Sequence, residues 1–345
     1  MKGTKTISII IITWNSEKKI RTALNYIRKQ DFLKEKLELI VVDGGSKDKT
    51  LKIIQNEKKR MNIQLIKTKI KDQEPKRAIG VLKAKGKYVC FIDPDNYMTE
   101  GNWLSRMVRP LEEDRSISGV QTLFYTYDKF ETPINRYFAL FGINDPVVFY
   151  LGKADRIPYF ENKWLNDKFE DKGDYYKIEL KDNNVPTMGC NGVILRRSHY
   201  LKANIKPDNF FHIDVIQDLV KKNYRFFAIV KNGILHSTGS TFFSSIGKRI
   251  EYMNIHYYKR QNQRRYFVFD SKSTKDKINL FKFTFFTLTF IEPLFLSIRG
   301  YIKKRDWAWF LHWPMCFGFL IAYSDTVIKE SIKKFFEKSK DAMKL

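Results

Sequence analysis

The chain has 345 residues, 43% of them hydrophobic, so it can bury a full-sized core and is not a disordered protein. Its 63 lysines and arginines exceed its 38 acidic residues and give a formal net charge of +25. This excess favours nucleic acid, acidic lipid or phosphorylated substrates as partners, unless it only makes the surface soluble. Three widely spaced cysteines, Cys90, Cys190 and Cys316, give no disulfide framework and suit a reducing compartment.

The first 120 residues alternate between short apolar runs and helical patterns. The runs are rich in β-branched residues and lack alternation, as buried parallel strands do. We therefore expect an α/β fold with a mainly parallel, Rossmann-like sheet flanked by helices. Strands are predicted at 7–12, 37–42, 63–67 and 88–92, and helices at 17–30, from Ser46 or Asp48 to about 60, and at 75–84.

The rest of the chain is less regular. Residues 122–182 are rich in aromatic side chains and are expected to form helices and loops. A strand is predicted at 189–196, a helix at 214–223, and a strand from 225 that leads to His236. Beyond residue 241 the sequence is basic and aromatic, which separates it in composition from what precedes it.

Acidic side chains follow two of the predicted strands. Asp43 follows the strand at 37–42, and Asp93-Pro94-Asp95 follows the strand at 88–92. Ligands of open α/β sheets bind outside the carboxyl ends of the strands. Two carboxylates this close repel unless a cation or a proton separates them, and hard oxygen ligands suit Mg²⁺ or Mn²⁺. A D-x-D turn alone is a weak signal, but its position after a buried strand makes it a candidate metal and diphosphate site.

Three linked blocks carry a resemblance to a known family. They are S-I-I-I-I-T-W-N at 8–15, E-L-I-V-V-D-G-G-S-K-D-K-T at 38–50, and K-R-A-I-G-V-L-K-A-K-G-K-Y-V-C-F-I-D-P-D-N at 76–96. In order and spacing they resemble the family-2 glycosyltransferases, which are inverting enzymes with the A-type nucleotide-sugar fold. The similarity covers residues 7–97 strongly and continues more weakly to about 238.

The resemblance implies roles for residues on the donor side. Thr13, Asn15 and Glu17 would line the nucleotide pocket. Asp43 would accept a hydrogen bond from the base, and Arg77 would lie along the nucleotide-binding wall.

The resemblance also implies the residues around the diphosphate. Asp93 would contact the sugar or ribose, and Asp95 would bind Mn²⁺ or Mg²⁺ bridging the diphosphate. His236 would complete the metal shell, the alternative being an ordinary polar residue at a strand end. Arg196, in a basic pair after a predicted strand, would steady the donor phosphates or an anionic acceptor, the alternative being a surface arginine.

An inverting transfer also needs a general base that deprotonates the acceptor hydroxyl, and a carboxylate is the usual solution. Related enzymes place it in an E-D pair before a helix of the second half. The corresponding stretch here, at 210–224, has Ile213 in place of the acidic partner. We choose Asp214 as the base, with His212 as a neighbour that assists or only packs.

The C-terminal part holds two apolar stretches, 278–298 and 307–328, each near the ~20 residues needed to span a bilayer. Both contain charged or polar residues, and a basic loop lies between them. A spanning hairpin would put this loop opposite a cytosolic catalytic domain, against the positive-inside tendency. We therefore expect peripheral or re-entrant attachment to an anionic membrane at its cytoplasmic face, with a spanning hairpin and a soluble helix pair as alternatives.

These features together predict a function and a division of the chain. A catalytic domain at 1–240 would bind the nucleotide-sugar with 1–120 and the acceptor with 121–240, and 241–345 would associate with the membrane. The resemblance implies metal-dependent transfer of a hexose or N-acetylhexosamine from a nucleotide diphosphate-sugar. A UDP-sugar is favoured over a GDP-sugar, because a carboxylate such as Asp43 can accept from a pyrimidine N–H. The acceptor is expected to be a lipid-linked glycan or a polyprenyl phosphate, in the assembly of cell-envelope glycans, glycolipids or protein glycans.

Other functions stay open at this stage. One is a polyprenyl-phosphate sugar synthase, and another is an inactive relative that binds nucleotide-sugar without transfer. A nucleotidyltransferase would normally have a glycine-rich basic loop after the first strand, where residues 13–16 read T-W-N-S. The charge of +25 would also suit a nucleic-acid-binding protein. No nucleic-acid motif accompanies the charge, so we expect no nucleic-acid partner. The sequence leaves the oligomeric state open.

Overall fold

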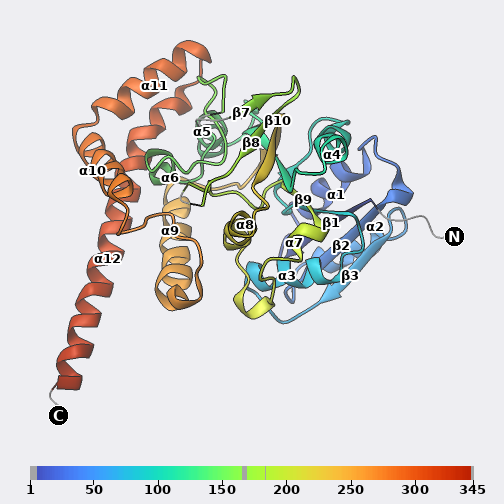
Figure 1. The fold of residues 1–345 in the computed structure, drawn as a ribbon, viewed down its shortest axis with the longest axis horizontal. Coiled ribbons are helices and arrows are strands. Elements are labelled where there is room, and N and C mark those ends of the chain that lie inside the picture. The colour runs from blue at the N-terminus through green and yellow to red at the C-terminus, as the bar shows by residue number, and fades with distance from the viewer. Residues whose placement is uncertain (1–5, 165–168, 183, 343–345) are drawn as a thin grey trace.

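The structure is a computed structural model that describes residues 6–164, 169–182 and 184–342. Its first part is built on a parallel sheet in which β1 (Ile7–Thr13) pairs with both β2 (Leu37–Asp43) and β4 (Tyr88–Phe91), and β2 pairs with β3 (Ile63–Lys67). These strands coincide with the four predicted ones to within one residue at each end. The expected α/β fold with a mainly parallel sheet is confirmed (Figure 1).

Helices cover both faces of this sheet, and alternate residues of β1 show why. Ile10 packs in one apolar cluster with Ala78 and Val81 of α3 (Gln73–Lys83). Its neighbours Ile9 and Ile11 point the other way, into a cluster with α1 (Ile20–Arg28), α2 (Thr50–Glu57) and α4 (Trp103–Glu113). A strand buried on both faces needs no polar alternation, which explains the run of isoleucines.

The sheet continues into the second half of the chain. In the described residues its order is β3-β2-β1-β4-β9-β6-β10-β8-β7, and β5 pairs with β10. Here parallel and antiparallel pairs mix: β6 and β10 are parallel, whereas β9 runs antiparallel to β4 and β6. The strands are β5 (Asn96–Tyr97), β6 (Gly119–Tyr125), β7 (Phe169–Asp171), β8 (Tyr175–Glu179), β9 (Ile194–Arg196) and β10 (Phe226–His236).

The predicted strand at 189–196 is shorter than expected. Only its last three residues form β9, because Gly189, Asn191 and Gly192 have φ angles of 134°, 54° and 86°, which are incompatible with a strand. This turn lies next to the start of α8, since a Cβ at Gly189 would be 2.8 Å from the carbonyl oxygen of His212. The helices of this half are α5 (Pro133–Phe141), α6 (Pro146–Tyr150), α7 (Arg197–Tyr200) and α8 (His212–Lys221).

The C-terminal part is helical and lies on one side of the sheet (Figure 1). In the described residues no single helix is long and apolar enough to cross a membrane, whereas α10 and α11 together are, but with a bend of 81° between them. Its elements are α9 (Phe242–Tyr252), the π-helix η3 (Met253–Lys259), α10 (Thr274–Thr289), α11 (Ile291–Lys303) and α12 (His312–Ala342). Short 3₁₀ turns are η1 (Lys34–Lys36), η2 (Pro207–Asn209), η4 (Gln261–Gln263) and η5 (Trp307–Leu311).

The C-terminal helices share a core with the second half of the predicted catalytic domain. Tyr137 and Phe141 of α5 belong to the same buried cluster as Trp309 and Phe319. The ring of Phe141 lies 4.9 Å from that of Trp309, and a buried ion pair of 2.6 Å joins Lys153 to Asp276. The boundary at residue 241 stays a prediction, but this contact makes 241–342 an integral part of the fold.

Candidate active site

A cavity of about 420 Å³ opens at the carboxyl ends of β1 and β4, where the sequence predicted a ligand site. Five of the predicted site residues line it: Thr13, Asn15, Glu17, Asp93 and Asp95. Eight further polar or aromatic residues of its lining were not predicted: Trp14, Ser16, Lys18, Lys19, Asp48, Lys71, Gln73 and Lys76. The cavity thus combines four carboxylates, among them Asp93 and Asp95, with four ammonium groups and an indole.

Two of the predicted pocket residues also shape the loop that they stand on. Asn15 adopts a φ of 47°, donates its backbone N–H to Ser46 and accepts the N–H of Lys47 on its side chain. Glu17 accepts the N–H of Lys49 at 2.8 Å. These bonds hold the loop after β1 against the loop after β2. The wall of the cavity that the loop after β1 forms is therefore ordered without a ligand.

Asp43 is 1% exposed and does not line the cavity. Its Oδ1 atom accepts the backbone N–H groups of Gly45 and Ser46, both at 2.9 Å, and its Oδ2 atom accepts the Ser46 hydroxyl. The carboxylate therefore closes the turn after β2 in this structure. Its predicted contact with a nucleotide base stays a prediction.

Arg77 joins Asp93 to a buried ion-pair network. Its guanidinium lies 2.7 Å from Asp93 and 2.8 Å from Glu74, and Glu74 lies 2.9 Å from the Nδ1 atom of His212. Burial by itself would raise the pKa of Glu74, but His212 and Arg77 outweigh it and lower this pKa to about 2. Burial would likewise lower the pKa of His212, but Cys190 and Glu74 raise it to about 10. Two anions and two cations thus balance between α3, β4 and α8.

Asp95 and His236 come together because β5 pairs with the end of β10. His236 is in register with Asn96, and the Ser237 N–H donates to the Asp95 carbonyl at 2.8 Å. The Nε2 atom of His236 then lies 3.8 Å from Asp95 Oδ1. Burial lowers the pKa of His236, which favours the neutral imidazole that a metal ligand must be.

The residues around Asp95 fit a divalent ion only in part. No group of three or more His, Cys, Asp or Glu side chains in the described residues could hold a metal. Asp95 and His236 offer two ligands, and the buried Nδ1 of His236 has no hydrogen-bond partner in the described residues. Further oxygen ligands would have to come from a diphosphate, as is usual for Mg²⁺. The predicted metal site at Asp95 and His236 stays a prediction with compatible geometry.

Four lysines also line the cavity: Lys18, Lys19, Lys71 and Lys76. Lys19 lies 3.5 Å from Asp95 Oδ2 and donates to the Thr238 carbonyl at 2.7 Å. Lys76 is 1% exposed, donates to the Thr13 carbonyl at 3.1 Å, and has its pKa lowered to about 8, chiefly by burial. Lys71 lies over the exposed ring of Trp14, 5.4 Å from its centre. The cavity is therefore suited to a ligand with a flat ring and a strongly anionic group.

Asp214, the predicted base, is part of a buried ion pair in this structure. Its side chain is 1% exposed, and both carboxylate oxygens accept hydrogen bonds from the Arg264 guanidinium at 3.0–3.1 Å. The N–H of Arg265 donates to the same carboxylate at 3.0 Å. These hydrogen bonds engage both oxygens of the Asp214 carboxylate. The structure makes Asp214 a structural ion pair that holds the chain after η4 against α8.

Arg196 lies at the end of the sheet opposite the cavity. It is paired with Tyr88, the first residue of β4, whereas Asp93 lies beyond the other end of that strand. Its guanidinium donates to the carbonyls of Ile117 and Leu111 at 3.1 and 2.6 Å. Arg196 therefore closes the amino end of the sheet and cannot steady donor phosphates at the carboxyl end.

Asp155 and Arg156 form a polar cluster that the sequence did not indicate. Arg156 is fully buried, lies 4.1 Å from the Tyr125 ring centre and donates to the Asn191 carbonyl. The Tyr125 ring in turn lies 5.4 Å from that of His236. Asp155 accepts on Oδ2 from Gln121 and Arg156, and its Oδ1 accepts no hydrogen bond from the described residues. Burial raises the pKa of Asp155, so this carboxylate holds a proton more readily than usual.

A mainly parallel sheet with acidic and basic groups at the carboxyl ends of its strands defines an α/β protein of the nucleotide-binding kind. Residues 8–200 match the description "Glycosyl transferase family 2", and this match covers more than half of the chain. The chain belongs to that family, which confirms the resemblance on which the sequence analysis relied.

Individual relatives match shorter parts. A 95-residue segment is 36% identical to the poly(ribitol-phosphate) beta-N-acetylglucosaminyltransferase TarS of Staphylococcus aureus, covering 27% of this chain and 17% of that protein. A 122-residue segment is 32% identical to a Methanococcus voltae enzyme named as a dolichyl N-acetyl-glucosaminyl phosphate glucuronosyltransferase, covering 33% and 37%. The mannosyltransferase PcManGT of Pyrobaculum calidifontis, solved with GDP-mannose and Mn²⁺, aligns over 92% of this chain and 86% of its own, with a TM-score of 0.50 and 12% identity. That likeness supports the fold alone.

Proposed function

We propose that the chain is an inverting, metal-dependent glycosyltransferase that uses a nucleotide diphosphate-sugar, with a UDP-sugar favoured. The observation that carries the proposal is the cavity at the ends of β1 and β4, where Asp95, His236 and Lys19 converge beside an exposed indole. Membership of family 2 supports the same reaction class. The sugar would be a hexose or an N-acetylhexosamine, and TarS is named for the transfer of an N-acetylglucosaminyl group.

The donor would lie with its base at Trp14 and its diphosphate at Asp95. Trp14 is 45% exposed on the cavity wall, and an exposed indole offers a stacking face for a base. Asp95 and His236 would hold Mn²⁺ or Mg²⁺, which supplies neutralisation of the leaving diphosphate when bound. Lys19 and Lys76 would add positive charge along the same wall. Asp93, held by Arg77, would accept hydrogen bonds from the sugar or ribose.

We assign the general base to Asp155 in place of Asp214. The acceptor hydroxyl would give its proton to Asp155, its oxygen would bond to the anomeric carbon, and the bond from that carbon to the diphosphate oxygen would break. Asp155 suits this step because Oδ1 has no hydrogen bond from the described residues and because burial raises the pKa of the carboxyl. The rings and guanidinium of Arg156, Tyr125 and His236 form a continuous stack that connects the surroundings of Asp155 to those of Asp95.

The acceptor proposed is a phosphate-bearing, lipid-linked glycan or polyprenyl phosphate. The two relatives above are named for a poly(ribitol-phosphate) and for a dolichyl phosphate sugar, and both acceptors carry phosphate. The net charge of +25 would favour such anionic acceptors over neutral ones. A phosphate polymer is therefore the second acceptor class to test.

The test is nucleotide release from a panel of UDP- and GDP-sugars by the full chain, with Mn²⁺, Mg²⁺ or chelator. We expect release from one nucleotide class, dependent on a divalent ion, and stimulated by a polyprenyl-phosphate saccharide in detergent or by poly(ribitol-phosphate). The Asp155→Asn variant should bind donor normally but turn over at least about a hundredfold more slowly. Donor binding without release under any condition would instead identify an inactive binder.

A further inference from the structure

Two helices of the C-terminal part carry apolar side chains on their outer faces. On α10 these are Ile278, Phe281, Phe285 and Leu288, whose spacing of three and four residues puts them on one side of the helix. On α11 the same spacing relates Ile291, Leu294, Phe295, Ile298 and Ile302. We call this the α10–α11 surface and define it by its most exposed members: Phe281, Leu288, Phe290, Ile291, Phe295 and Ile302.

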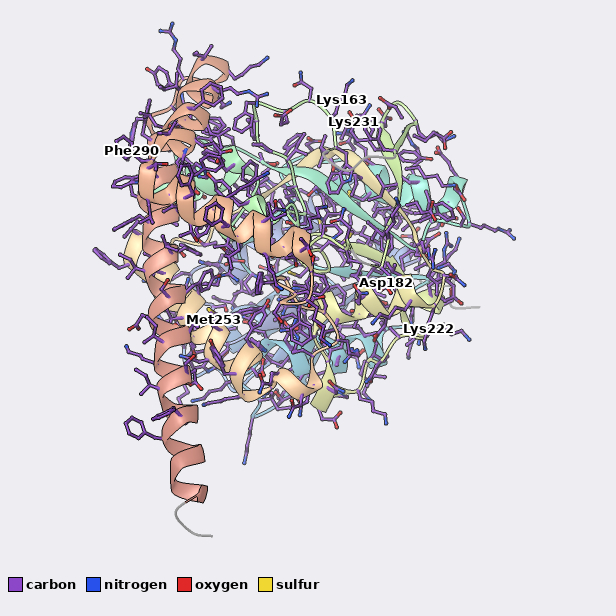
Figure 2. All side chains as sticks on the ribbon, turned by 60° about the vertical axis from the view of Figure 1, so that its left-hand side comes forward. Lys163, Asp182, Lys222, Lys231, Met253 and Phe290 are labelled. Carbon is purple, nitrogen blue, oxygen red and sulfur yellow. The ribbon has the colours of Figure 1, made fainter. Side chains whose placement is uncertain are left out.

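The inner faces of the same helices are already buried against the protein. Phe283 of α10 is 1% exposed and Leu296 of α11 is 7% exposed, both in the cluster with α5 and α12. These helices are thus apolar on both sides, although one side faces outward. Figure 2 shows Phe290 at the outer edge of the molecule, beside the C-terminal helices. An apolar surface of this extent indicates a binding partner.

The charges around the α10–α11 surface indicate which partner. Every exposed charged side chain between residues 274 and 305 is basic: Lys275, Lys277, Lys282, Arg299, Lys303 and Arg305. The acidic residues at the two ends, Asp276 and Asp306, are buried and paired with Lys153 and Arg136. Two copies that met through this surface would bring like charges together, whereas an anionic lipid headgroup layer would neutralise them.

The shape of the surface fits a membrane interface better than a span. Phe290, at the junction, has a φ of 46°, and the helices it joins differ in direction by 81°. Both can therefore lie in one plane, with their aromatic and aliphatic side chains in the acyl region and their lysines extending to the headgroups. Trp307, at the start of η5, and Trp313, near the start of α12, are both exposed, and indole rings suit that depth.

We propose that the α10–α11 surface docks on an anionic phospholipid bilayer, with both helices in the interface plane. The inference goes beyond the proposed function and does not depend on it, because membrane binding can be measured without transfer. It also accounts for a lipid-linked acceptor. Short contacts connect the surface to the site: Arg136 of α5 lies 3.0 Å from Asp306, and its neighbour Asn135 accepts the Thr238 hydroxyl at 2.5 Å. Thr238 in turn accepts the Lys19 ammonium.

The experiment is co-sedimentation of the full chain with vesicles of phosphatidylcholine, with and without phosphatidylglycerol. We expect binding to the anionic vesicles that weakens with salt. Phe281→Ser with Phe295→Ser should weaken it on the order of tenfold or more at every salt concentration, because two aromatic rings no longer leave water. Lys275→Gln with Lys277→Gln should weaken it roughly fivefold per lysine at low salt only.

A matched control is Leu33→Ser with Leu82→Ser, which removes two leucines of 53% and 51% exposure from the first half of the chain. This pair should bind vesicles as the unaltered chain does. The proposal is overturned if the chain does not sediment with anionic vesicles, or if the phenylalanine and leucine pairs behave alike. It is also overturned if sedimentation velocity without lipid shows a dimer that the phenylalanine pair dissociates, because the surface would then join two copies.

Discussion

The two halves of the predicted catalytic domain are held together differently. Up to β4, the strands pair in parallel with one another, and the cavity is lined by residues that follow these strands. In the second half, contacts join distant residues: Arg264 pairs with Asp214, Tyr127 donates to Asp306, and Tyr323 donates to Asp145. In the first half, the residues of the proposed donor site therefore follow strands that pair locally, whereas the second half depends on long-range contacts for its fold.

The largest expected effect tests the chemical role of the first half. Asp95→Asn should lower turnover roughly a hundredfold or more, because the divalent ion that neutralises the leaving diphosphate loses its carboxylate ligand. Folding should be unaffected, since the Asp95 side chain is 25% exposed and its nearest cation lies 3.5 Å away. Nucleotide release and thermal unfolding measure the two properties. Asp325→Asn on α12, where the carboxylate is exposed, is the control that should change neither. If Asp95→Asn lost turnover and stability together, the proposed role of Asp95 as a metal ligand would be contradicted.

The second test concerns stability in the second half. Asp214→Asn should lower the free energy of unfolding by about 3–5 kcal/mol, because it leaves the buried Arg264 guanidinium without its partner. Urea denaturation measures this change. Asp155→Asn should cost less stability and more turnover, since the buried Arg156 keeps its hydrogen bonds to Thr122, Tyr125 and Asn191. If Asp214→Asn instead unfolded normally and lost only turnover, Asp214 would be the base after all.

A smaller effect is expected at the cavity wall. Trp14→Ala should weaken nucleotide binding by about 1–3 kcal/mol, the usual contribution of one stacked base. The loss should appear in the KM for the donor and in titration with the free nucleotide, with kcat little changed. Trp14→Phe should recover part of the affinity, because a smaller ring still stacks. A lower kcat with unchanged nucleotide affinity would show that the nucleobase does not stack on Trp14.

The smallest effect is a pH dependence of stability where the halves meet. The raised pKa of His212 means that its stabilising contribution is complete below its ordinary value of 6.5 and is lost as the pH rises towards about 10. The lowered pKa of Glu74 means that its contribution is complete above 4.5 and is lost as the pH falls towards about 2. Both act fully between pH 4.5 and 6.5. Thermal unfolding of His212→Gln should therefore show less loss of stability between pH 6.5 and 10 than the unaltered chain; an unchanged slope would contradict the pairing.

The difference between local pairing in the first half and long-range contacts in the second also explains which features the sequence could predict. The four strands of the first half and the carboxylates after them follow from local apolar periodicity, which determines both the elements and their sheet edge. The lysines at 18, 19 and 76 lie beside predicted site residues, so the motif carried a signal that we did not use. The ion pair of Asp214 and the position of Arg196 could not be predicted, because their partners, Arg264 and the Leu111 carbonyl, are 50 and 85 residues away. Asp155 had no local pattern that could indicate it.

The cluster that joins α5 to the C-terminal helices has a consequence for how such a chain can change in evolution. Tyr137 and Phe141 from one segment and Trp309 and Phe319 from the other bury each other, so neither segment is a module that can be exchanged alone. A chimaera that combined residues 1–240 with the C-terminal part of a relative would expose this cluster unless α5 and α6 were transferred as well. Diversification of the C-terminal part is therefore tied to α5 and α6.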